Sequence, residues 1–79
     1  MNFYELGKEL ATLRKNKKIS QQTIADDLNI SRATISNFES GSNNDIGLKK
    51  ALQLIDYLGY ELNIKEKSPF PSFEDVING

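Results

Sequence analysis

Apolar side chains recur at the spacing of an amphipathic helix in four stretches of the chain. The first predicted helix runs from a cap at Asn2 to about Lys17, and the others cover about residues 21–28, 32–40 and 46–58. The apolar residues on the inner faces of these helices are Phe3, Leu6, Leu10, Leu13, Ile24, Ala25, Leu28, Ile35, Phe38, Leu48, Ala51, Leu52, Ile55 and Leu58. The pattern therefore predicts a mainly α-helical domain.

Residues that often cap helices stand at the ends of these stretches. A side-chain oxygen just before a helix can accept a hydrogen bond from a free backbone N–H of the first turn. The predicted N-caps are Asn2, Ser20, Ser31 and Asp45. At the other ends, Asn29, Gly41 and Gly59 are residue types that tolerate the left-handed conformation in which helices often stop.

After Gly59 the pattern changes from helical spacing to strict alternation of apolar and polar residues over positions 60–65. This is the period of a half-buried strand, with Tyr60, Leu62 and Ile64 on one face. A single strand needs a partner for its backbone groups. We therefore expect the same strand of a second copy to pair with it across a two-fold axis, which predicts a homodimer.

The last residues, 68–79, are predicted to be a flexible acidic tail, separate from a domain over residues 1–67. Two prolines oppose both helix and strand in this segment, and Phe70 and Phe73 are costly to leave in water. Three interpretations stay open: disorder at a terminus, contact with the dimer's own surface, or a partner-binding peptide anchored by the two phenylalanines.

The composition argues against an enzyme. The chain has 79 residues, enough for one domain, and contains neither Cys nor His. Disulfides, thiolate or imidazole metal sites and a histidine general base are therefore excluded. We expect no cofactor and no metal. Since no run of about 18 apolar residues and no signal-peptide pattern is present, the expected location is the cytoplasm, in association with the nucleoid.

The net charge of −1 argues mildly against a nucleic-acid-binding protein, which is usually basic. The segment 68–79 makes the total negative, because it carries two acidic side chains and no basic one, whereas residues 1–67 carry 10 basic and 9 acidic side chains. The placement of charge therefore matters more than its total, and non-specific affinity for DNA is expected to be weak and sensitive to salt.

The centre of the chain has the organisation of a helix-turn-helix. Two short predicted helices are joined by the turn Asn29-Ile30-Ser31, with a small residue, Ala25, where they must approach closely. In this motif the second helix enters the major groove and the first crosses the DNA backbone.

The residues of this region resemble the Xre/Cro-type helix-turn-helix family of phage and bacterial repressors. The resemblance rests on the runs Ile19–Ala25, Leu28–Ser31 and Thr34–Gly41. It covers about residues 5–65 and implies a four-helix, lambda-repressor-like domain. Asn29 stands where the family usually has Gly. The run Ala33–Glu39 and the single strand after Gly59 look like the HipB-type antitoxin subgroup, which implies a HipA-like Ser/Thr kinase toxin as partner.

Position in the motif suggests which residues read bases. Arg32 and Ala33 open the third helix, the end that reaches base edges, and Ser36 and Asn37 lie one turn further on. Arg32 can bond guanine through two hydrogen bonds, Ala33 can touch a thymine methyl, and Asn37 suits adenine or a phosphate. For Arg32 and Asn37 the competing interpretation is an ordinary solvated residue on a helix surface.

Phosphate contacts are predicted around these base-reading residues. Gln21 lies at a helix N-terminus, where amide donors and the helix dipole favour an anion, and the family resemblance implies the same contact. The further candidates are Ser31, Thr34, Ser40, Ser42, Asn43, Lys15 and Lys17. The lysines after Arg14 have an equally good structural explanation, since cations at a helix C-terminus interact favourably with its dipole. The family resemblance also implies that Arg14 pairs with Glu39 and braces the third helix.

Taken together, these features predict a homodimeric repressor that binds an inverted-repeat operator and is the antitoxin of a HipBA-like module regulating its own operon. Two alternatives are kept open. One is a protein-interaction adaptor that binds or neutralises a partner without binding DNA, and the other is a phage-type repressor.

Overall fold

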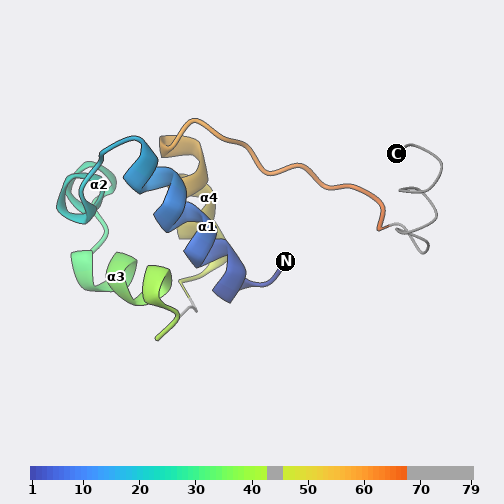
Figure 1. The fold of residues 1–79 in the computed structure, drawn as a ribbon, viewed down its shortest axis with the longest axis horizontal. Coiled ribbons are helices and arrows are strands. Elements are labelled where there is room, and N and C mark those ends of the chain that lie inside the picture. Colours follow the sequence, from blue (N-terminus) through green and yellow to red (C-terminus); the bar gives the residue numbers. More distant parts are fainter. Residues whose placement is uncertain (43–45, 68–79) are drawn as a thin grey trace.

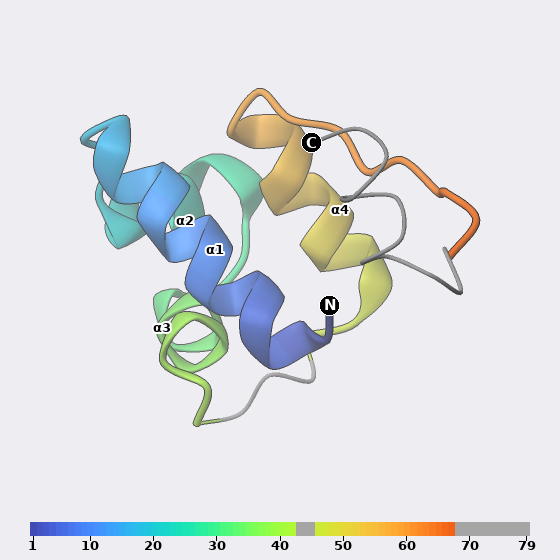
Figure 2. The ribbon, with the colours of Figure 1, turned by 45° about the vertical axis from the view of Figure 1, so that its right-hand side comes forward.

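The computed structural model describes residues 1–42 and 46–67. These residues form four helices, α1 (Phe3–Asn16), α2 (Gln21–Leu28), α3 (Arg32–Ser40) and α4 (Leu48–Tyr57). Helices α2 and α3 lie at one end of the molecule (Figure 1), and α1 runs between α3 and α4 (Figure 2). The prediction of a mainly α-helical domain is confirmed. No helix within the described residues is both long and apolar enough to pass through a membrane.

One hydrophobic core joins all four helices. Its largest fully enclosed side chains are Phe38, Ile24, Ile35 and Leu58, each no more than 1% exposed. Burying a side chain of this size stabilises the fold by roughly 1.5–3 kcal/mol. Since two of the four come from α3, this helix is fixed in rotation about its own axis.

Three predicted N-caps are confirmed. The Oγ of Ser20 accepts from the N–H of Thr23 at 3.0 Å, and the Oγ of Ser31 accepts from the N–H of Thr34 at 3.1 Å. Asn2 forms a reciprocal capping box with Glu5 at the start of α1. These caps set the first residue of α1, α2 and α3.

Helices α1 and α3 approach closely at Gly7. A Cβ atom placed on Gly7 would lie 2.1 Å from the backbone oxygen of Phe38, which is nearer than any real carbon contact. Only glycine fits at this crossing, and it allows the backbone of α1 to pack directly on that of α3. At the end of α3, Gly41 has a φ of +81° and lies against the ring of Tyr4.

The predicted limits of α1 and α4 need small corrections. α1 ends at Asn16, with Lys17 as its C-cap. α4 begins at Leu48 and not at about residue 46, because Gly47 has a φ of +87°, outside the helical region, and serves as an N-cap without a side-chain bond. The buried Ile46 packs into the core ahead of the helix. Asp45, the predicted cap, lies outside the described residues.

The predicted strand over residues 60–65 is absent from the single chain, in which residues 60–67 have no regular secondary structure (Figure 1). The reason is physical: a strand needs a neighbour for its backbone groups, and the described part of one chain offers none. Tyr60, Leu62 and Ile64 are 49%, 53% and 97% exposed. Phe70 and Phe73 of the predicted tail lie outside the described residues.

Candidate nucleic-acid interface

The helix-turn-helix turn is built around Asn29, which adopts the left-handed conformation with a φ of +56°. Asparagine is one of the few residues other than glycine that visits this region readily. The next residue, Ile30, is buried, and its N–H donates to the carbonyl of Ala25 at 3.0 Å. The turn therefore closes over the core and directs the chain into α3.

Helix α3 presents a polar face to solvent because its apolar face is held inside. Ile35 and Phe38 are 1% and 0% exposed. On the outside, Arg32, Ala33 and Asn37 are exposed. Ser36, the fourth predicted base contact, is half-buried at the edge of this face. The structure thus brings the four predicted base-contacting residues onto one side of one rigid helix.

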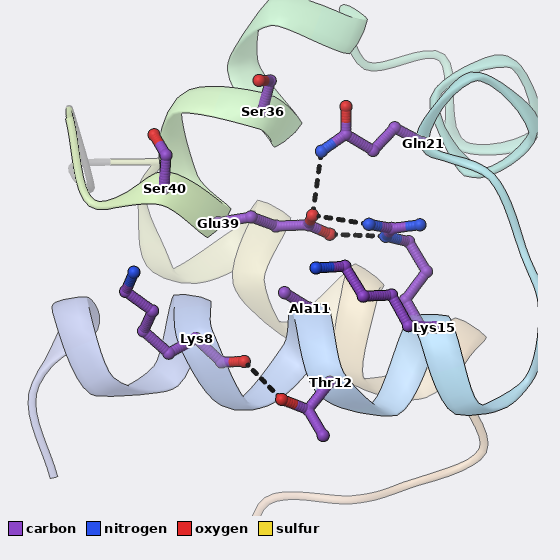
Figure 3. Close-up of a pocket in the computed structure, with 9 residues that line it drawn as sticks. Lys8, Ala11, Thr12, Lys15, Gln21, Ser36, Glu39 and Ser40 are labelled. Atoms are coloured by element: carbon purple, nitrogen blue, oxygen red, sulfur yellow. Dashed lines mark hydrogen bonds and ion pairs between the residues drawn. The ribbon is translucent and has the colours of Figure 1, made fainter.

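A buried ion pair ties α3 to α1. The Nε and Nη2 atoms of Arg14 donate to the two carboxylate oxygens of Glu39 at 2.7 and 2.9 Å (Figure 3). The third guanidinium nitrogen, Nη1, donates to the carbonyl of Ile19 at 2.7 Å. Both side chains are 9% exposed, so the pair is largely desolvated. Charge-assisted bonds of this two-pronged kind fix geometry strongly.

Gln21, the first residue of α2, joins the same pair. Its Nε2 donates to Oε1 of Glu39 at 2.9 Å (Figure 3). Position in the sequence suggested a phosphate contact for Gln21 but did not reveal this bond. The carboxylate of Glu39 therefore connects α3 to both α1 and α2. It also sets the orientation of the Gln21 amide at the α2 N-terminus.

An open groove of about 380 Å³ lies over this network, between α1 and α3 (Figure 3). Its lining residues are Lys8, Ala11, Thr12, Arg14, Lys15, Gln21, Ser36, Glu39 and Ser40. Lys8 and Thr12 were not among the predicted site residues. The signal was present in the sequence, because positions 8, 11, 12 and 15 follow helical spacing and share one face of α1.

The remaining phosphate candidates are dispersed around α3. Ser31 and Thr34 lie at its N-terminus, with their hydroxyls 2.7 Å apart, and Ser40 and Ser42 lie at its C-terminus, also 2.7 Å apart. Asn43 lies outside the described residues.

The two predicted phosphate-binding lysines near the end of α1 are separated by the structure. Lys15 lines the groove between α1 and α3. The Nζ of Lys17 lies instead 6.0 Å from the ring centre of Tyr60. A cation at this distance from an aromatic face is attracted to it. Lys17 therefore has a contact of its own away from the groove.

A second tie between helices lies away from the groove. The hydroxyl of Tyr57 in α4 donates to Oδ2 of Asp27 in α2 at 2.6 Å. This hydrogen bond is the main reason that the pKa of Tyr57 is raised above 10.0, and partial burial and the negative charge of Asp27 act in the same direction.

Comparison with known proteins agrees with this geometry. A family model described as helix-turn-helix matches residues 10–64, which include the C-terminal part of α1, all of the other helices and the Arg14–Glu39 pair. No curated protein and no solved structure matched the chain. Since the matched region is well over half of the sequence, the chain belongs to the Xre/Cro-type helix-turn-helix family.

Proposed function

We propose that this protein is a sequence-specific DNA-binding regulator that represses transcription, and that it is not an enzyme. The observation that carries the proposal is the exposed face of α3, where Arg32, Ala33 and Asn37 project from a helix fixed by buried Ile35 and Phe38. Such a helix fits the major groove of B-DNA, and its N-terminal residues meet base edges there.

We further propose that the protein acts as a homodimer through residues 60–65. Tyr60, Leu62 and Ile64 are left largely exposed by the single chain. Leu62 also lines a mostly apolar groove of about 210 Å³, together with the N-terminal residues Met1 and Asn2 and residues of α1 and α4. Pairing with a second copy would give the strand its partner and cover these side chains. The two α3 helices would then read half-sites of an inverted repeat, about one helical turn or a multiple of it apart.

The regulatory role that we propose is that of an antitoxin. In this proposal the dimer represses its own operon and binds a HipA-type Ser/Thr kinase toxin. Support comes from the resemblance of Ala33–Glu39 to HipB-type antitoxins and from the acidic segment 68–79 with its two phenylalanines. A cytoplasmic, nucleoid-associated location accompanies this role.

The test begins with selection of bound duplexes from a randomised DNA pool by the full chain. Recovery of an inverted repeat would support the repressor. A gel-mobility shift of a DNA fragment that carries the same repeat, taken from the region upstream of the protein's own gene, would support it further. Failure to enrich any sequence at low salt would contradict it. Stable association with the product of a neighbouring gene, without any DNA shift, would favour an adaptor instead.

A further inference from the structure

We propose that the groove between α1 and α3 seats a phosphate of the DNA backbone, and that Lys8 is one of its ligands. The inference rests on the proposed function and deepens it, because it extends the interface along α1, from which Lys15 was the one predicted phosphate contact. Lys8 lies 13 positions before the helix-turn-helix begins at Gln21. The motif alone therefore does not point to it.

The groove has donors along both walls. Lys8 and Lys15 come from α1, while Ser36 and Ser40 come from α3 (Figure 3). The side chain of Lys8 extends from α1 toward α3, and the amide of Gln21 lies at the other end of the groove (Figure 3). Ammonium, hydroxyl and amide groups are the donors that bind phosphate oxygens in protein–DNA complexes.

The charge of the groove favours an anion although the whole chain carries −1. The ionic side chains that line it are three cations, Lys8, Arg14 and Lys15, and one carboxylate, Glu39. Both oxygens of Glu39 already accept hydrogen bonds, from Arg14 and from Gln21. Its negative charge is therefore compensated within the protein, and the charges of Lys8 and Lys15 are left for a ligand.

The position of the groove identifies the source of the anion. Ser36 and Ser40 lie on α3 beside the exposed Asn37, so the groove adjoins the face that we propose to read bases. When a helix lies in the major groove, the phosphates that border that groove run along its flanks. A backbone phosphate of the same DNA is thus the anion that meets this surface.

Lys8 is held where it can serve this purpose. Its Nζ lies 5.4 Å from the centre of the Tyr4 ring, an arrangement that attracts the ammonium group to the aromatic face. Tyr4 in turn packs against Gly41 at the end of α3. The contact limits the positions available to Lys8 and leaves ammonium hydrogens free to donate to a phosphate.

The salt dependence of binding to the selected duplex tests the proposal, with Lys8→Ala, Lys8→Arg and Lys67→Ala compared with the unaltered chain. The slope of log K against log salt is negative, and loss of one phosphate contact makes it shallower by about 0.9, so a dimer that loses two contacts should show about twice that change. Lys8→Arg should keep the slope, and so should Lys67→Ala, which removes a charge outside the helices. Base preference should not change in any variant.

Duplexes with single methylphosphonate substitutions then locate the contact. One neutralised phosphate in each half-site should weaken binding by the unaltered chain and have a clearly smaller effect on Lys8→Ala, which has already lost one of the ligands of that phosphate. An unchanged slope in Lys8→Ala would overturn the inference while leaving the proposed function intact, whereas absence of selective binding by the unaltered chain would overturn both. If inorganic phosphate bound saturably and the DNA slope did not change, the groove would be assigned to a free anion.

Discussion

Glu39 in α3 accepts two hydrogen bonds from Arg14 in α1, at 2.7 and 2.9 Å, and both side chains are only 9% exposed. The pair spans 25 positions of the sequence and, through Gln21, also includes α2. The same carboxylate thus bonds to α1 and α2, the helices that flank α3, and helps to fix α3, the helix that we propose to read bases.

Removal of one member of this pair is expected to be costly. Glu39→Ala would leave the guanidinium of Arg14 buried without its carboxylate, and breaking a buried pair in this way destabilises a protein by about 3–5 kcal/mol. Denaturant unfolding monitored by circular dichroism measures the loss. Glu9→Gln, which removes an exposed carboxylate of α1, is the control and should change stability little. The double variant Arg14→Met/Glu39→Leu should recover much of the loss, and a single variant as stable as the control would contradict the role of the pair.

Gly7→Ala is expected to destabilise the protein although alanine is the better helix former. In an open helix this change would gain about 0.5–1 kcal/mol. Here the new Cβ would meet the backbone oxygen of Phe38, and the two helices would have to separate. Overpacking of this kind costs about 1–3 kcal/mol. The sign of the change in unfolding free energy decides the matter, since a more stable variant would show that α1 and α3 are not in close contact.

The sequence was informative wherever a local rule decides the structure. The spacing of Ile35 and Phe38 predicted which side of α3 faces outward, and Ser20 and Ser31 marked where two helices begin. The Gln21–Glu39 bond and the groove at Lys8 were missed, because both depend on how distant helices pack together. The strand at residues 60–65 was predicted from alternation alone, and alternation cannot supply the second strand that such a structure requires.

Arg32→Ala should relax the preference for one base pair in each half-site. A two-pronged bond from arginine to guanine contributes about 1–3 kcal/mol of discrimination. Competition gel shifts against duplexes substituted at each position in turn would show the effect. Lys67→Ala removes the same charge outside the helices and should keep every preference. If Arg32→Ala also kept every preference, Arg32 would be a solvated surface residue and not a base contact.

Truncation after Gly59 should give a monomer that keeps its four helices and binds the operator weakly. The deletion removes Tyr60, Leu62 and Ile64, the exposed residues that we propose to pair between copies. Sedimentation equilibrium measures the change in mass, and circular dichroism checks that the helices remain. A truncation after Lys67 is the matched control, since it removes residues 68–79 but keeps the proposed strand. If the chain truncated after Gly59 still dimerised with undiminished self-association affinity, strand pairing would be excluded as the basis of association.

The hydrogen bond between Tyr57 and Asp27 predicts a specific response to alkaline pH. Because the folded protein raises the pKa of Tyr57 above 10.0, the protonated phenol is stabilised in the native state. This contribution is fully present below pH 10.0 and is lost as the pH rises through the higher folded pKa. Unfolding free energies of the unaltered chain and of Tyr57→Phe should therefore differ at pH 8 and converge above the folded pKa. Tyr60→Phe, which keeps the Tyr57–Asp27 bond, should follow the unaltered chain. A constant difference between Tyr57→Phe and the unaltered chain across this range would show that the bond does not form in solution.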